Sequence, residues 1–288
     1  MAPGCWRKTV DPNARRRTGQ GPHGGTGVGS GLAFVPQWAT RRALRRSLPT
    51  ANAMQLIGPD SAPIARDIDV FAALVPLASA RIVELGCGNA ELTRALATRH
   101  PDARITAFEV DRVQHAKNLA GSAPPNVVFG YGSADAIPLP DASCDVVLMA
   151  KSLHHVDVPA MDAALAEIAR VLQPGGYAAF SEPVYAGEFN ALMAIFHDEQ
   201  RVREAAFGAL RRAVADGRFE LVAERFHTAE RRFADFADFE RRMIGVTHTA
   251  HRLTAEQLAA VRERFARTAT PAGALFHQPM RIDVLRKP

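Results

Sequence analysis

Two glycines at the end of a short apolar run are the residues of this chain best suited to hold a ligand. Gly86 and Gly88 belong to the sequence Val-Glu-Leu-Gly-Cys-Gly-Asn-Ala, which runs from residue 83 to residue 90. Glycine lets the backbone come close to a bound molecule at the carboxyl end of a strand. Glu109 follows 21 residues after Gly88, and a carboxylate at that place can accept hydrogen bonds from both hydroxyls of a ribose. The spacing therefore predicts a site for a ligand that contains a nucleoside.

The charges around this loop distinguish between two such ligands. A dinucleotide places its pyrophosphate at the N-terminus of the helix after the loop, where free amides and the helix dipole favour an anion. Here Glu91 replaces the third glycine of the usual dinucleotide pattern, and its carboxylate would repel a pyrophosphate. Glu84, just before the loop, suits the ammonium and sulfonium groups of S-adenosylmethionine. We expect S-adenosylmethionine as the cofactor, with a nicotinamide dinucleotide as the less favoured alternative.

The elements that must position this loop alternate regularly along the chain. Short apolar runs alternate with segments of helical spacing, and this order predicts a mostly parallel sheet that helices cover on both faces. The predicted strands lie at 81–85, 105–108, 127–129, 145–149 and 177–181, and the predicted helices at 64–75, 91–99, 112–120 and 160–172. In the last third we expect helix over most of 189–215 and over 254–267, with strands at 219–222 and 280–285.

Five motifs in this order give the chain a likeness to a known family. They are Glu84–Gly88, Glu109, Gly132–Asp141, Asp145–His155 and the turn Leu172–Gly176. Together they resemble the class I S-adenosylmethionine-dependent methyltransferases, most closely the methyltransferase domain of the ubiquinone and menaquinone biosynthesis type. The resemblance covers residues 80–182 and implies an α/β fold, a Rossmann-like sheet of seven strands, mostly parallel, with the last strand inserted antiparallel. It also implies one domain over 54–288, with the cofactor core at about 80–182 and a helical cover on the substrate side at about 183–270.

The resemblance assigns cofactor contacts to particular positions. The residues expected to bind the cofactor are Glu84, Gly86, Cys87, Gly88, Glu109, Ser133, Ala134, Asp135 and Ala150. Cys87 is expected to contribute only its backbone. Two positions depart from the family pattern: Ala90 stands in place of the third glycine, and Ser133 in place of the acid that usually contacts adenine. Asp135 is the residue that could take over the contact with the exocyclic amine.

Methyl transfer from a sulfonium is an in-line displacement, so the protein mainly has to position the two partners and exclude water. A general base is needed only if the acceptor must lose a proton. His154 and His155 follow the fourth predicted strand and are the candidates for that base; the alternative is that the pair only orients the loop. We expect Glu182 and Tyr185 to line the acceptor pocket. The pair at 197–198, His-Asp, is expected to be solvated, and the alternative is that it reaches into the cleft as a lid contact.

Composition narrows the class of protein further. No apolar run approaches the roughly 18 residues needed to span a membrane, and the three cysteines, at positions 5, 87 and 144, are far apart. They indicate neither a disulfide framework nor a metal site, a pattern typical of soluble cytoplasmic proteins. The net charge of +5 is concentrated in residues 1–53, which carry +8 and leave −3 for the rest of the chain. We therefore expect a small-molecule acceptor, and neither a nucleic acid nor a membrane as partner.

Residues 1–53 differ from the rest of the chain. Seven glycines lie between positions 19 and 31, and four arginines follow at 41, 42, 45 and 46. A segment with so few apolar side chains cannot bury a core. Three interpretations are open: a flexible, disordered basic tail, an organellar transit peptide, or a translated leader before a natural start at Met54. The leader is slightly favoured, because regular patterning begins just after Met54.

The function expected from these features is methyl transfer from S-adenosylmethionine to a small molecule. A protein of the same fold that binds the cofactor without catalysis is the main alternative, and a nicotinamide-dependent oxidoreductase is a weaker one. The acceptor, its methylated atom and the oligomeric state stay open at this point.

Overall fold

The computed structural model describes residues 50–59, 61–246 and 251–288 of the chain. The expectations for residues 1–49 concern residues outside these ranges. In the described part of the chain, no helix combines the length and the apolar character that crossing a bilayer requires.

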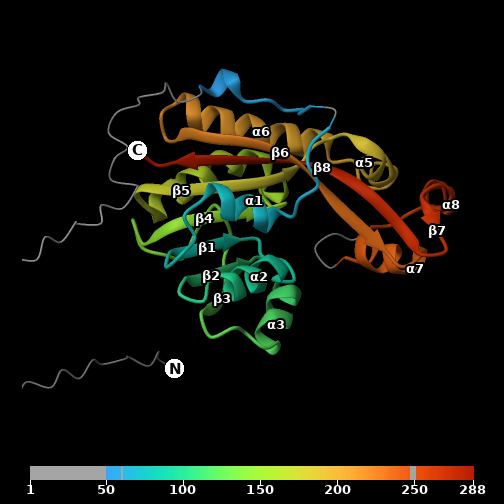
Figure 1. The fold of residues 1–288 in the computed structure, drawn as a ribbon, viewed down its shortest axis with the longest axis horizontal. Coiled ribbons are helices and arrows are strands. Elements are labelled where there is room, and N and C mark those ends of the chain that lie inside the picture. Colours follow the sequence, from blue (N-terminus) through green and yellow to red (C-terminus); the bar gives the residue numbers. More distant parts are fainter. Residues whose placement is uncertain (1–49, 60, 247–250) are drawn as a thin grey trace, which may run out of the picture. The chain divides into compact units, whose positions relative to one another are not determined.

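One sheet organises the described residues, as Figure 1 shows. Its long strands are β1 (Arg81–Leu85), β2 (Arg104–Glu109), β3 (Val127–Tyr131), β4 (Cys144–Ala150), β5 (Leu172–Pro183), β6 (Glu220–Phe233) and β8 (Gly273–Arg286). They lie in the order β3-β2-β1-β4-β5-β8-β6, and β8 runs antiparallel to both β5 and β6. The two-residue strand β7 (Ala269–Thr270) pairs with β8. The predicted mostly parallel sheet of seven strands with an antiparallel last strand is thus confirmed, with β7 as a short addition.

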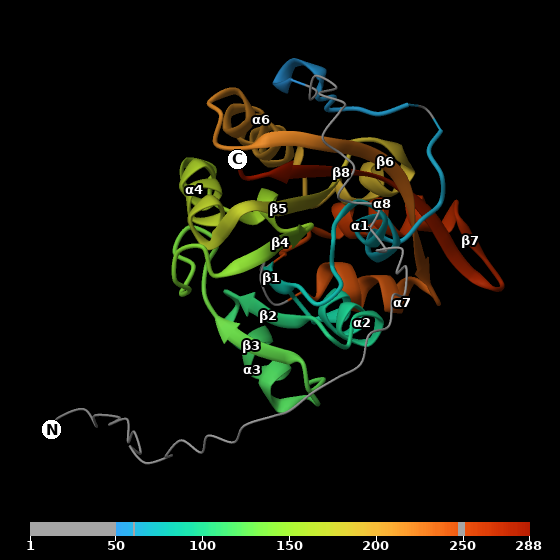
Figure 2. The same cartoon turned by 60° about the vertical axis from the view of Figure 1, so that its left-hand side comes forward.

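Helices cover both faces of this sheet (Figure 2). One face packs against α1 (Asp67–Leu74) and α2 (Glu91–Arg99), and the other against α4 (Met161–Val171) and α6 (Gln200–Ala215). The edge strand β3 and its neighbour β2 contact α3 (Arg112–Ala120). Alternation along β1 separates the two cores, since Ile82 faces α1 and α2 whereas Val83 and Leu85 face α4 and α6. The loop that follows β1 therefore leaves the sheet between two packed layers.

The strands β6 and β8 are much longer than the strands predicted at 219–222 and 280–285. Pairing between β5 and β8 ends at Met280, and beyond that point β8 pairs only with β6 and β7. The resulting two-stranded arm carries α7 (Phe236–Phe239) and α8 (Ala255–Ala266) and has an aromatic core of its own. One face of the arm is filled by exposed polar residues such as Glu230 and His277. The apolar alternation that predicts the two short strands does not extend into the arm, so the predicted strands stop before it.

The first predicted helix starts later than its apolar spacing indicated. The chain becomes helical only at Asp67, and Ile64 is exposed. The backbone around Ile64 pairs instead with Thr228 of β6, which receives and donates main-chain hydrogen bonds there. Pairing with a strand that is distant in the sequence thus replaces the first helical turn.

The helix expected over most of 189–215 is divided in the structure. α5 (Gly187–Met193) and α6 are separated by residues 194–199, which hold His197 and Glu199. α6 packs beside α4 on the sheet, whereas α5 packs against β8 and α8. In the segment expected as a helical cover, α6 therefore packs on the sheet, whereas α5, α7 and α8 pack against the arm.

Candidate functional site

The glycine loop has a backbone conformation that favours glycine. Gly86 and Gly88 have φ values of +70° and +53°, in a region of backbone conformation that residues other than glycine rarely adopt. Gly86 is also crowded, because a Cβ there would lie 2.7 Å from the Cβ of Ser152. Beside Gly88 a Cβ would meet nothing within 4 Å, so the loop borders open space on that side. The thiol of Cys87 is buried, and burial raises its pKa far above its usual range.

Glu109 fastens this loop to β2. One of its carboxylate oxygens accepts a hydrogen bond from the Gly88 amide at 2.6 Å, and the other accepts from the amides of Val110 and Asp111 at 2.8 Å each. A carboxylate offers about four acceptor positions, so one is left for a ligand hydroxyl. The structure therefore brings Gly88 and Glu109 into direct contact. While Glu109 accepts hydrogen bonds from the three amides, it can accept one more, from a single ribose hydroxyl.

Glu84 lies beneath helix α2. Alternation along β1 turns its side chain toward α2, where it is 2% exposed and accepts a hydrogen bond from the Thr93 hydroxyl at 2.6 Å. Burial raises the pKa of the Glu84 carboxyl to about 7, against the opposing effects of Thr93 and the Lys151 charge. When ionised, Glu84 can therefore act on a ligand only through its electric field, because its side chain is buried under α2 and does not face the open space beside Gly88.

The other predicted cofactor residues lie at neighbouring strand ends. Ser133, Ala134 and Asp135 follow β3; the first two are half-buried and Asp135 is exposed. Ala150 is the last residue of β4 and pairs with Ser181 of β5. These positions share the carboxyl edge of the sheet with the glycine loop.

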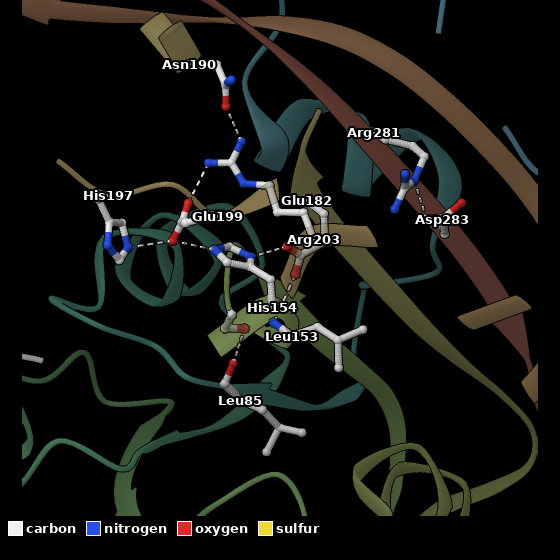
Figure 3. A network of polar contacts seen from close by, with 11 residues as sticks. Leu85, Leu153, His154, Glu182, Asn190, His197, Glu199, Arg203, Arg281 and Asp283 are labelled. Atoms are coloured by element: carbon white, nitrogen blue, oxygen red, sulfur yellow. Dashed lines mark hydrogen bonds and ion pairs between the residues drawn. The ribbon is translucent and has the colours of Figure 1, made fainter. Parts of the chain in front are cut away.

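His154 is held between two carboxylates (Figure 3). Its Nδ1 is hydrogen-bonded to Glu182, and its Nε2 lies 3.5 Å from Glu199. Burial by itself would lower the pKa of His154, but the two carboxylates raise it to about 9. Because both ring nitrogens face carboxylates, His154 is not placed to act as a base in this arrangement. His155 is exposed, and its ring packs against that of His154 in a tilted arrangement, with centroids 4.2 Å apart.

Glu199, which sequence reasoning did not single out, connects this histidine pair to α5 and α6. It accepts hydrogen bonds from His197 at 2.9 Å and from Arg203 at 2.5 Å, and Arg203 donates to Asn190 at 2.7 Å. Burial would raise the pKa of Glu199, but His154, His197 and Arg203 hold it far below its usual range. His197, expected to be solvated, is therefore part of a buried polar network.

A second polar cluster, also not singled out from the sequence, lies at the start of α1. Asp67 accepts hydrogen bonds from Lys151 at 2.6 Å, Ser181 at 2.8 Å and His227 at 3.0 Å. Burial would raise the pKa of Asp67, but these donors hold it well below its usual range. The cluster ties α1 to the carboxyl ends of β4 and β5 and to the middle of β6.

The two residues expected to line the acceptor pocket come together in the structure. Glu182 and Tyr185 border a cavity of about 140 Å³, together with Leu56, Arg203 and Arg281. Another cavity, of about 300 Å³, lies between α7, α8 and the tip of the arm, and none of the predicted site residues lines it. The smaller cavity is therefore the better candidate for part of an acceptor pocket.

Comparison with known proteins shows that the part of the chain around the glycine loop is similar to methyltransferase domains. Residues 82–176 match the family model described as a methyltransferase domain. The 27-O-demethylrifamycin SV methyltransferase of Amycolatopsis mediterranei is 36% identical over 147 residues, which are 49% of this chain and 52% of that protein. The ubiquinone/menaquinone biosynthesis C-methyltransferase UbiE of Methylobacterium nodulans is 34% identical over 100 residues, which are 33% of this chain and 39% of that protein. The chain thus spans about half of the first relative's length and less of the second's.

Solved structures agree on the fold. A candidate methyltransferase from Bacillus halodurans C-125 superposes with a TM-score of 0.53 at 17% identity, over 77% of this chain and 99% of that one. At this identity the likeness shows the fold alone. Residues 82–176 are thus similar in sequence to methyltransferase domains, the fold of the described residues agrees with this similarity, and both imply S-adenosylmethionine as the cofactor. The match to UbiE covers a third of the chain and leaves the finer resemblance open.

Proposed function

We propose that this protein catalyses transfer of the methyl group of S-adenosylmethionine to a small-molecule acceptor. The observation that carries the proposal is the loop of Gly86 and Gly88, which Glu109 fastens while keeping one acceptor position for a ligand. The methyltransferase-domain match at 82–176 contains this loop.

The residues around the loop fit the cofactor. We place the ribose at Glu109, the methionine part along Gly86–Gly88 and the adenine at Ser133–Asp135. When bound, the cofactor supplies an electrophilic methyl group on its sulfonium. The protein's own task is to hold the open space beside Gly88, exclude water and keep the acceptor in line, because positioning accounts for most of the catalysis in such a displacement.

For the acceptor we propose the region around His155, Glu182 and Tyr185. His155 is the exposed member of the histidine pair, and we assign His154 a positioning role because two carboxylates engage its ring. Relatives named for a rifamycin and for ubiquinone or menaquinone support a small-molecule acceptor. The finer resemblance to the ubiquinone and menaquinone type belongs to the same proposal, and so does the absence of a nucleic-acid partner.

Binding tests the cofactor part of this proposal. The full chain should bind S-adenosylmethionine and S-adenosylhomocysteine with micromolar affinity, about −8 kcal/mol, as measured by calorimetry. Glu109→Ala removes a hydrogen bond to a charged acceptor, worth about 1.5–3 kcal/mol, so both affinities should fall about tenfold to over a hundredfold. Glu188→Ala, which removes an exposed carboxylate paired with Arg264, is the matched control and should leave both affinities unchanged.

Two outcomes would contradict the proposal. Binding of a nicotinamide dinucleotide in place of both ligands would make the protein an oxidoreductase. Tight binding of both ligands, with no methyl transfer to any component of a metabolite extract, would make it a non-catalytic binding protein.

A further inference from the structure

Four of the chain's ten histidines lie close together, and three of them, His154, His155 and His197, surround the carboxylate of Glu199. His154 and His155 come from the turn after β4, His197 from the segment before α6, and His251 from the segment before α8. His197 Nε2 lies 2.9 Å and His154 Nε2 3.5 Å from the same oxygen of Glu199 (Figure 3). The rings of His197 and His251 pack with centroids 4.7 Å apart. The methyl transfer proposed above does not require such a gathering.

We propose that His154, His155 and Glu199 form a binding site for a divalent transition metal ion such as Zn²⁺, with His197 as a further donor. One ligand atom from each of the first three residues lies within 4.8 Å of the other two. Imidazole nitrogens with a single carboxylate suit Zn²⁺ and its first-row neighbours, whereas Mg²⁺ and Ca²⁺ prefer oxygen ligands. The donor set therefore selects the class of ion.

The spacing between His154 and Glu199 suits a shared ion better than a hydrogen bond, whereas His197 makes an ordinary hydrogen bond of 2.9 Å to the same oxygen. An N–H···O hydrogen bond spans about 2.7–3.2 Å, and His154 Nε2 lies 3.5 Å from Glu199 Oε1. Two atoms that each bind Zn²⁺ at about 2.0–2.1 Å are roughly 3.4 Å apart in a tetrahedral site. Separations of up to 4.8 Å within the set have to shorten when an ion binds. The exposed side chain of His155 is the one placed to move.

Both buried ligands already have the partners that fix metal-binding side chains. Metal-binding histidines usually give their second ring nitrogen to a carboxylate or carbonyl, and His154 gives Nδ1 to Glu182. Glu182 is itself held by the Leu153 amide at 2.9 Å. The second oxygen of Glu199 accepts a hydrogen bond from Arg203 at 2.5 Å. These contacts leave His154 Nε2 and the first oxygen of Glu199 facing each other.

The site adjoins the proposed acceptor region, since Glu182 also borders the cavity that contains Tyr185. A metal ion lowers the pKa of an oxygen bound to it and so activates that oxygen near neutral pH. An ion here would promote loss of a proton from an acceptor hydroxyl, a task for which His154 is not placed. This role rests on the proposed function, whereas the metal site itself does not.

Metal binding can be measured on the full, untagged chain without cofactor or acceptor. After dialysis against EDTA, the protein is titrated with Zn²⁺ and Co²⁺ by calorimetry, and the Co²⁺ absorption spectrum reports coordination by nitrogen and oxygen. We expect one equivalent of either ion to bind with micromolar or tighter affinity, and Mg²⁺ not to compete. His155→Ala should weaken binding at least tenfold. His277→Ala, which removes an exposed histidine of β8 outside the cluster, should bind like the wild type.

Two further variants separate a ligand from its partner. Glu199→Gln should weaken binding more than His155→Ala does, and Glu182→Gln should weaken it by about 10–100-fold. If Glu199→Gln fails to fold, the exposed His155 still decides the matter. Absence of Zn²⁺ and Co²⁺ binding below millimolar concentration, or equal affinity in His155→Ala and wild type, would overturn the proposal. S-adenosylhomocysteine binding is measured on the same samples, and its loss would count against the cofactor site alone.

Discussion

The cofactor half of the domain, residues 80–182, and the acceptor half, residues 183–288, shape their sites in different ways. In the cofactor half the deciding feature is the backbone, with left-handed glycines at 86 and 88 and amides that Glu109 holds. In the acceptor half the deciding features are side chains, and Glu199 and Arg203 meet His154 only in the folded protein. The family match, at 82–176, lies within the first half. Similarity to relatives therefore carries the cofactor over to this chain, but not the acceptor.

The largest effect on folding is expected in the acceptor half. Arg203 is 8% exposed and holds both Glu199 and Asn190. Arg203→Ala leaves a buried carboxylate without its arginine, which should cost about 3–5 kcal/mol of the free energy of unfolding, measured by urea denaturation. Arg201→Ala, on the exposed face of the same helix, should change it by no more than about 0.5 kcal/mol. A loss of S-adenosylhomocysteine affinity beyond twofold in folded Arg203→Ala would show that the two halves are not independent.

Gly86→Ala should damage both folding and cofactor binding. At φ +70°, with a Cβ 2.7 Å from that of Ser152, the variant combines backbone strain and overpacking and should lose about 2–4 kcal/mol of stability. Gly175→Ala, at φ +78° with nothing within 4 Å of the new Cβ, adds strain alone, about 1–2 kcal/mol. By calorimetry, only Gly86→Ala should weaken S-adenosylhomocysteine binding, by at least tenfold. Equal affinity in the two variants would remove Gly86 from the cofactor site.

Glu84 should give the cofactor half a characteristic dependence on pH. Burial raises the pKa of its carboxyl from 4.5 to about 7, so the folded protein favours the protonated form. The associated stabilisation is present below about pH 4.5 and is lost as the pH rises through about 7, an effect of about 3 kcal/mol. Glu84→Gln removes this loss, so its stability relative to wild type should rise between about pH 5 and about pH 8. A difference that urea denaturation finds constant over that range would contradict the raised pKa of the buried Glu84 carboxyl.

Ala90 should give the smallest effect. Its φ of +58° is left-handed although it is not glycine, which costs about 1–2 kcal/mol, whereas its buried methyl group contributes about 0.8 kcal/mol. Ala90→Gly should therefore stabilise the protein by up to about 1 kcal/mol. Ala97→Gly, at a buried position inside helix α2, should destabilise it by about 1 kcal/mol or more. Thermal unfolding of both variants should show melting temperatures that move in opposite directions.

The fold could be predicted where an element is decided by its own residues. The helices expected at 91–99 and 112–120 match α2 and α3, because apolar spacing and the flanking breaks are local signals. The strand at 280–285 was too short and the start of the helix expected at 64–75 was wrong, because both depend on pairing with β6. Such pairing leaves no pattern within the segment itself.

The candidate site divides in the same way. Glycine spacing and a single acid indicated the loop and Glu109, whereas Glu199 was not recognised because it lies in a break between helices that the sequence pattern did not show. A signal for Arg203 was available: it falls on the same helix face as Phe207 and Leu210, at spacings of four and seven residues. An arginine on an apolar face must have a buried partner. Cysteine spacing gives no indication of a metal site formed by histidines from separate segments, such as the one proposed above.

The central claim, methyl transfer from S-adenosylmethionine, is tested most directly by following the methyl group itself. The protein is incubated with methyl-labelled S-adenosylmethionine and a metabolite extract, and both S-adenosylhomocysteine and labelled products are measured. The account predicts that S-adenosylhomocysteine forms only when extract is present, in amounts equal to the labelled product, and that Glu109→Ala slows both about tenfold or more at subsaturating cofactor. If no extract yields labelled product above the level found with Gly86→Ala, the protein does not transfer methyl groups as proposed.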